Sequence, residues 1–190
     1  MSKFLLLLTF LSCTTPSDNP FCPTGEVETL FVKRHEKKHA LRSRMAAHRV
    51  FSIDVNEMVG VGTGTVFDFE GTTVVLTAAH VVSAPGSRVS IEVGSSFYSC
   101  EVVYFDSLAD LAVLIPESSA NLHPLPWKTT PPRQMGIYDE VSYTGYPNND
   151  AKLSVKGYIS AVSENGNYYL HSYAWSGASG SSVYDKNGKL

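Results

Sequence analysis

From residue 48 onward, the chain consists of short segments rich in Val, Ile, Tyr, Phe and Thr, separated by Gly, Pro, Asn and Asp. Runs of β-branched and aromatic residues bounded by turn residues are typical of β-strands. No stretch shows helical periodicity long enough to build an α/β domain. The segments expected to form strands are 49–54, 60–68, 73–77, 88–93, 97–105, 110–115, 139–145, 153–162, 167–173 and 180–184.

These strand segments fall into two groups. Six of them precede a Pro-rich connection at 116–136, and four follow it. Consecutive short strands without intervening helices indicate an all-β chain, and the grouping predicts two successive antiparallel β-barrels. We expect the first barrel at 48–122 and the second at 123–190.

The N-terminal part has the features of an export signal followed by a tether, together spanning residues 1–22. Lys3 supplies a positive start, and "FLLLLTFL" (4–11) is an apolar core too short to cross a bilayer, which takes about 20 residues. Cys13 stands where bacterial lipoproteins carry their lipidated cysteine, although Phe10 and Leu11 match that pattern poorly. We therefore expect a periplasmic, cell-surface or secreted protein, and a lipid anchor at Cys13 stays open.

Removal or acylation of Cys13 leaves two cysteines in the chain, Cys22 and Cys100. An oxidising compartment would permit these two to form a disulfide. Two cysteines alone do not establish that they pair.

Basic residues are concentrated at 33–44, where six basic side chains accompany one acidic; the rest of the chain carries nine basic and seventeen acidic residues. Nucleic-acid binding requires a basic face on the folded domain, so it is not expected. Within this run, "HEKKH" (35–39) fits a two-histidine zinc pattern. Burying the neighbouring Lys and Arg charges beside a metal would be costly. We expect no metal site and interpret 23–47 as a solvated basic extension.

Three other motifs carry candidate chemistry. His80 ends an apolar run in "VVLTAAHVV" (74–82), Asp110 precedes the apolar run "LAVLIP", and glycines separate the serines of "SGASGSS" (176–182). Each motif alone has an ordinary structural explanation, as a strand end, a turn and a surface loop. Together they supply the hydroxyl, the base and the orienting acid that nucleophilic catalysis needs.

The order "GTGTVF", "LTAAHVV", "DLAVL", "GASGS" resembles the chymotrypsin-fold, or trypsin-like, serine proteases, most closely their compact bacterial HtrA-like form, over about residues 48–190. The resemblance implies that His80 is the general base, Asp110 its orienting acid and Ser179 the nucleophile. It also implies an oxyanion hole formed by the backbone N–H groups of Gly177 and Ser179. An α/β-hydrolase is excluded, because its nucleophile precedes the other two residues and Ser181 replaces the last glycine of its motif.

Two positions depart from the digestive trypsins. Ala178 stands where they carry the Asp that captures a newly cut N-terminal amine, so activation by that route is not expected. Tyr173 stands where they carry the carboxylate that binds Lys or Arg, which implies a neutral substrate pocket for small or apolar side chains. His171 and the segment "SYTGYP" (142–147) are interpreted as structural.

The family continues through two more strands after the motif "SSVYDKNGKL", so the second barrel is expected to be incomplete at its C-terminal end. No substrate-tethering C-terminal domain is expected either. The resemblance implies a serine endopeptidase that cleaves polypeptides through an acyl-enzyme without a cofactor. A protease-like binding or scaffold protein without turnover is the alternative, and a metalloprotease built on His35 and His39 is a third hypothesis. The sequence does not indicate the natural substrate or the oligomeric state.

Overall fold

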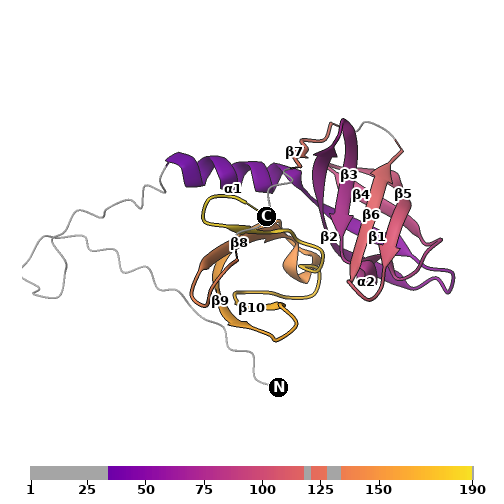
Figure 1. Ribbon diagram of the computed structural model, residues 1–190. Coiled ribbons are helices and arrows are strands. Elements are labelled where there is room, and N and C mark those ends of the chain that lie inside the picture. The colour runs from indigo at the N-terminus through magenta and orange to yellow at the C-terminus, as the bar shows by residue number, and fades with distance from the viewer. Residues whose placement is uncertain (1–33, 118–120, 128–133, 190) are drawn as a thin grey trace, which may run out of the picture. The chain divides into compact units, whose positions relative to one another are not determined.

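A computed structural model of the chain describes residues 34–117, 121–127 and 134–189, except for the side chains of 34–37 and 39 (Figure 1). The predicted signal and tether with Cys13 and Cys22, and the side chains of His35 and His39, therefore lie outside the described part. Its elements are, in chain order, α1 (Arg34–Ala46), β1 (Ala47–Ile53), β2 (Val59–Phe69), β3 (Thr72–Thr77), α2 (Ala79–Val82), β4 (Arg88–Val93), β5 (Ser96–Asp106), β6 (Leu111–Pro116), β7 (Leu125–Pro126), β8 (Glu140–Gly145), the 3-10 turn η1 (Pro147–Asn149), β9 (Leu153–Val162), β10 (Tyr168–His171) and β11 (Val183–Asp185).

The first six strands form a closed antiparallel barrel. They pair in the order β1-β4-β5-β6-β3-β2, and β1 also pairs with β2, which closes the ring. The predicted first barrel is therefore confirmed. The two-residue strand β7 was not predicted; it pairs in parallel with the end of β2, so Leu125 and Pro126 lie beside this barrel.

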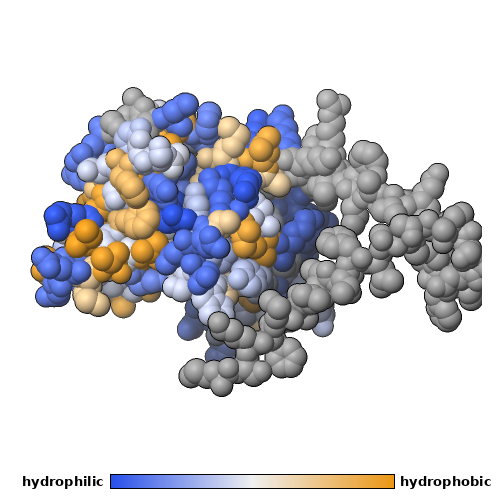
Figure 2. All heavy atoms as spheres, turned by 180° about the vertical axis from the view of Figure 1, so that it is seen from behind, coloured by the Kyte–Doolittle hydropathy of each residue, from blue (hydrophilic) through white to orange (hydrophobic). Residues whose placement is uncertain are grey.

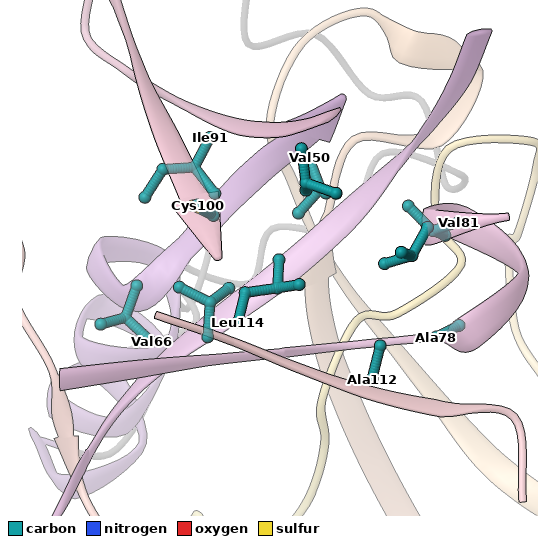
Figure 3. Packing of buried hydrophobic residues seen from close by; sticks show 11 residues of the cluster. Val50, Val66, Ala78, Val81, Ile91, Cys100, Ala112 and Leu114 are labelled. Atoms are coloured by element: carbon teal, nitrogen blue, oxygen red, sulfur yellow. The ribbon is translucent and has the colours of Figure 1, made fainter. Parts of the chain in front are cut away.

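The inside of the first barrel is filled by small and medium-sized apolar side chains. Alternate residues of each strand point inward, as a pleated strand requires, and the strand residues are joined by Val81 and Val82 from α2. Figure 3 shows these side chains converging from different strands. The buried members are Val50, Val66, Val75, Ala78, Val81, Val82, Val89, Ile91, Cys100, Ala112 and Leu114.

Cys100 is a free thiol inside this core, where only 8% of its surface is exposed. Burial raises the pKa of the thiol to about 12. A thiol of this kind is unreactive, because the thiolate is the reactive form of cysteine. Cys100 therefore acts as a small apolar core residue in this structure.

The second sheet is open. Its four strands pair in the order β10-β9-β8-β11, so within the described residues β10 and β11 are edge strands, and the predicted incompleteness of the second barrel is confirmed. Its inner face lines a groove of about 770 Å³ whose walls include Val141, Ile159, Leu170 and Val183. Over the surface shown in Figure 2, hydrophobic residues emerge in separate clusters between hydrophilic ones.

The basic extension ends in the helix α1, which contacts β8 and β2. The Lys152 ammonium donates to the Arg44 carbonyl at 2.9 Å, and the Ser43 and Thr144 hydroxyls lie 3.4 Å apart. The C-terminal turn of α1 is thus attached to the end of β8 and to the residue that precedes β9. Among the described residues, no helix is long and apolar enough to cross a membrane.

Thr63 of β2 joins the first barrel to the loop that carries Ser179. Its N–H donates to the Ser179 carbonyl and its hydroxyl donates to the Gly177 carbonyl, both at 2.8 Å. The side chain is completely buried. Gly180 lies against the same place, since a β-carbon added to it would come within 2.2 Å of the Thr63 carbonyl oxygen and 2.9 Å of the Ala78 nitrogen.

We expect Gly180→Ala to destabilise the protein more than Gly71→Ala. Both glycines have a positive φ, +82° and +84°, which costs an alanine roughly 1–2 kcal/mol. A β-carbon at Gly71 meets open space, whereas one at Gly180 collides with backbone atoms. Overpacking of this kind typically adds ~1–3 kcal/mol. Urea unfolding of both variants measures the difference, and equal losses would show that the Gly180 loop does not press on the barrel.

His48 of β1 is buried close to the end of α1, with 7% of its surface exposed. Its Nδ1 lies 3.1 Å from the Glu92 carbonyl oxygen. Burial lowers the pKa of the imidazole below 6.5, and the Lys152 charge lowers it further, although the hydrogen bonds to the Glu92 and Met45 carbonyls act in the opposite direction. The folded protein therefore keeps His48 neutral at a pH where the unfolded chain protonates it.

Stability should fall as the pH drops below about 6.5. In that window the unfolded state binds the extra proton on His48, so the free energy of unfolding decreases with decreasing pH until the lowered pKa of the folded state is passed. His48→Gln removes the group that binds this proton, so the free energy of unfolding of the variant should depend less on pH. Urea midpoints measured from pH 7.5 to 5 test this, and an unchanged slope in the variant would contradict it.

Candidate active site

His80 is positioned by a single helical turn. The sequence predicted it at the end of a strand, but β3 ends at Thr77 and His80 belongs to α2. Its neighbours Ala79, Val81 and Val82 are buried in the barrel core, so the imidazole is directed outward and its side chain is 58% exposed. Burial of the neighbours thus presents the His80 ring at the barrel surface.

Asp110 lies directly before β6, as predicted. The turn that leads to it is closed by the Asp106 carboxylate, which accepts hydrogen bonds from the backbone N–H groups of Leu108 at 2.8 Å and Ala109 at 3.0 Å. Asp110 itself has a φ of +51°, a left-handed conformation that Asp tolerates better than most residues. The turn and this conformation direct the Asp110 carboxylate back toward α2.

The Asp110 carboxylate contacts His80 in two ways. Its Oδ2 lies 2.8 Å from the ring Nδ1, and its Oδ1 accepts the His80 backbone N–H at 3.0 Å. Partial burial raises the pKa of this carboxyl, but the hydrogen bonds from the His80 backbone and ring and the interaction with the imidazole outweigh burial and leave the pKa below 3.8. Asp110 is therefore ionised at neutral pH and fixes both the position and the rotation of the His80 ring.

Ser179 occupies a loop of two consecutive turns before β11. The Ala178 N–H donates to the Trp175 carbonyl at 2.9 Å, and the Ser181 N–H donates to the Ala178 carbonyl at 3.1 Å. In both turns the third residue is a glycine with a positive φ, +95° at Gly177 and +82° at Gly180. Type II turns require this conformation at that position, so the two glycines of "GASG" serve the turns.

The backbone N–H groups of Gly177 and Ser179 have no acceptor among the described residues, although their carbonyls are both bound by Thr63. Buried or partly buried N–H groups are normally paired. Two neighbouring free donors are what a binding site for a carbonyl oxygen or an oxyanion requires. The loop therefore presents two donors that the protein itself does not use.

The structure brings His80 and Asp110 into direct contact and brings the Ser179 loop against the segment that leads to His80. Gly180 lies close to Thr77 and Ala78, the residues that end β3 and precede α2. Within the described residues, no hydrogen bond joins the Ser179 hydroxyl to His80. The hydroxyl and the imidazole thus share one region without being hydrogen-bonded to each other.

The predicted pocket residue Tyr173 lies between the end of β10 and the Ser179 loop, with 57% of its surface exposed. Its backbone carbonyl accepts a hydrogen bond from the Tyr143 hydroxyl. His171 stacks on Tyr158, with 4.8 Å between the ring centroids, which agrees with a structural role for His171.

Sequence reasoning missed Thr63 and Asn148 as contacts of the loop. The Asn148 N–H donates to the Ser176 carbonyl at 2.6 Å. In the sequence, the one sign of a special role for Thr63 is its place between Gly62 and Gly64. In the structure, β-carbons added to these two glycines would collide with Val81 and Val75. Two glycines flanking one residue indicate close packing at that residue, but the sequence does not show that Thr63 contacts the Ser179 loop.

A metal centre finds no support in the described part of the chain, which contains no cluster of three or more His, Cys, Asp or Glu side chains able to hold an ion. The side chains of His35 and His39 are not included in this statement.

The fold resembles that of bacterial proteases. The serine endoprotease from Yersinia pestis superposes with a TM-score of 0.68 at 23% identity over 84% of this chain, which spans 56% of the Yersinia chain. The Rv3671c protease from M. tuberculosis in its active form gives a TM-score of 0.64 at 22% identity, over 82% of this chain and 72% of that one. At these identities the likeness shows the fold alone. No curated protein sequence matches the chain.

The sequence itself matches the family model described as "Trypsin-like peptidase domain" over residues 62–190. This range contains most of β2 and all of β3 to β11, and with them His80, Asp110 and the Ser179 loop. The match covers more than half of the chain and confirms the resemblance drawn from the sequence motifs. The chain belongs to the trypsin-like peptidase domain family.

Proposed function

We propose that this protein is a serine endopeptidase that hydrolyses peptide bonds through an acyl-enzyme. The observation that carries the proposal is the contact between Asp110 and His80, at 2.8 Å from carboxylate to ring, close to a loop with two unused N–H donors around a serine. An oriented base, a hydroxyl and an oxyanion site are the three parts that acyl transfer needs. Membership of the peptidase family supports the same reaction.

In this mechanism the Asp110 carboxylate accepts a hydrogen bond from the Nδ1–H of His80, so the proton of the neutral ring stays on Nδ1 and its lone pair lies on Nε2. Nε2 takes the proton of the Ser179 hydroxyl as Oγ attacks the substrate carbonyl. The oxyanion that forms accepts hydrogen bonds from the Gly177 and Ser179 N–H groups. His80 then gives its proton to the leaving amine, and a water molecule activated by the same ring releases the acyl group from Ser179.

The substrate would be a polypeptide with a small or apolar side chain before the cleaved bond. The position that binds basic side chains in digestive trypsins is the neutral, exposed Tyr173 here. No negative charge is available at Tyr173 to compensate a buried Lys or Arg of the substrate, and an unpaired charge is costly to bury.

The N-terminal sequence supports the further proposal that the protein acts outside the cytoplasm, where a lipidated Cys13 would tether it to a membrane. The positive start and the apolar run at 4–11 carry this proposal. Metabolic labelling with a fatty-acid analogue, with Cys13→Ala as the unlabelled control, tests the tether.

A binding protein of the same fold that lacks turnover is the second candidate. The missing hydrogen bond between the Ser179 hydroxyl and His80 favours it. Hydrogen bonds of this kind are often long without substrate and tighten in the complex, so the observation does not exclude catalysis.

A fluorophosphonate should label Ser179 covalently, because phosphonylation uses the same hydroxyl, base and oxyanion site as acylation. Ser179→Ala should abolish labelling and reduce kcat on the order of 10⁶-fold. Ser182→Ala, three residues further on, is the matched control and should react like the parent protein. Peptide mapping of the adduct and peptide hydrolysis assays measure both effects. A probe on another serine, or a folded protein that never reacts, would favour the binding protein.

Chelators should leave hydrolysis unchanged, since the proposed chemistry uses no metal. The double variant His35→Ala and His39→Ala should likewise keep the parental kcat, because both residues lie in the basic run outside the barrel. Hydrolysis rates before and after treatment with EDTA test this. Activity that EDTA removes and zinc restores would establish the metalloprotease instead.

A further inference from the structure

The Ser176–Gly177 peptide decides whether the Gly177 N–H is available to a substrate. It is the central peptide of the turn from Trp175 to Ala178. Type I and type II turns differ by a rotation of this central peptide by about 180°. The φ of +95° at Gly177 corresponds to type II. In the type I form, the Ser176 carbonyl would take the side on which the Gly177 N–H now lies.

Asn148 holds this peptide from the opposite side. Its backbone N–H donates to the Ser176 carbonyl at 2.6 Å. Rotation of the peptide would remove the acceptor and turn the Gly177 N–H toward the Asn148 N–H, so two donors would face each other without an acceptor. The hydrogen bond is therefore specific for the orientation that leaves the Gly177 N–H free.

The Asn148 N–H reaches this place because two consecutive residues are left-handed. The φ angles are 62° at Asn148 and 54° at Asn149, directly after Pro147. Asn adopts this conformation more readily than other residues with a β-carbon, and β-branched residues avoid it. The Asn149 N–H donates to the Tyr146 carbonyl at 2.9 Å and closes the turn.

The turn from Tyr146 to Asn149 is itself anchored to the first barrel. The Tyr146 N–H donates to the Thr63 hydroxyl oxygen at 3.1 Å. The centroid of the Tyr146 ring lies 4.7 Å from the guanidinium carbon of Arg49. A β-carbon on Gly177 would come within 2.4 Å of both the Tyr146 carbonyl oxygen and Asn149 Oδ1. The turn thus packs directly on the peptide that it holds.

We propose that the Tyr146–Asn149 turn is a positioning element that keeps the Gly177 N–H in the oxyanion-binding orientation, with Asn148 and Asn149 as its positioning residues. This inference rests on the proposed function. Ala178 stands at the position of the trypsin carboxylate that would capture an N-terminal amine, so a neutral backbone hydrogen bond performs the positioning in this chain.

The test compares Asn148→Val with Asn148→Gly. The side chain of Asn148 is exposed, so neither change disturbs the core, and the two differ in how well they tolerate a φ of 62°. Asn148→Val should lower kcat and the fluorophosphonate labelling rate by about 10²–10³-fold, the usual loss when one oxyanion donor is removed. KM and the pH dependence should stay near those of the parent protein, because substrate contacts and the His80–Asp110 pair are untouched.

Asn148→Gly should keep the parental rates, and Asn148→Ala should fall between Gly and Val. A peptide aldehyde, whose adduct places an oxyanion in the same site, should lose affinity in the same order. Thermal melting of each variant monitors folding, and the Ala variant retains the test if the Val variant does not fold.

Equal kcat and labelling rates in the parent, Gly and Val proteins would overturn this inference and leave the proposed function intact. Equal losses in Gly and Val would overturn it as well, because the Asn148 side chain would then be responsible. A parent protein that never reacts with the probe would remove the proposed function first and this inference with it.

Discussion

The two hydrogen bonds from Thr63 to the carbonyls of Gly177 and Ser179 are the interaction on which the candidate site depends. Thr63 belongs to β2, which is paired on both sides in a closed barrel, so its donors have a fixed position. The barrel also carries His80 and Asp110. The buried Thr63 thereby attaches the Ser179 loop to the same barrel that carries His80 and Asp110. Removing one donor would leave a carbonyl unpaired at a buried contact, which typically costs ~1–3 kcal/mol.

The charges and dipoles of the site are positioned by two short segments, the turn at Asp106 and the Ser179 loop. The Asx-type turn at Asp106 directs Asp110 toward α2, and the ionised Asp110 then fixes His80 through both its ring and its backbone. The serine loop carries no ionisable side chain from Trp175 to Ser182, and it offers backbone dipoles instead. Backbone donors held in place need no reorganisation when a negative charge develops, which is the condition for efficient electrostatic stabilisation.

Much of the fold was predictable, because strand and turn chemistry is local. All ten predicted strand segments have counterparts, and Asp110 lies at the start of its strand as expected. His80 was wrongly assigned to a strand end, because "AAHVV" is as apolar as a strand and only its packing into the barrel makes it helical. The strand β7 escaped prediction because its two residues are defined only by pairing with β2. Thr63 and Asn148 act through backbone partners that lie far away in the sequence, so no local pattern revealed them.

The closed barrel and the open sheet have different consequences for local stability. The barrel has no free strand edge among its six strands, whereas β10 and β11 each pair on one side only within the described residues, so the amides of the second sheet should exchange their hydrogens through smaller openings. Ser179 belongs to this looser half, and His80 and Asp110 belong to the tighter one. Each half also carries one of the two tryptophans: Trp127 packs against Phe67 and Phe69 beside the barrel, and Trp175 lies exposed in the serine loop. The intrinsic fluorescence of the protein can therefore distinguish loosening of the Ser179 loop from unfolding of the barrel that carries His80.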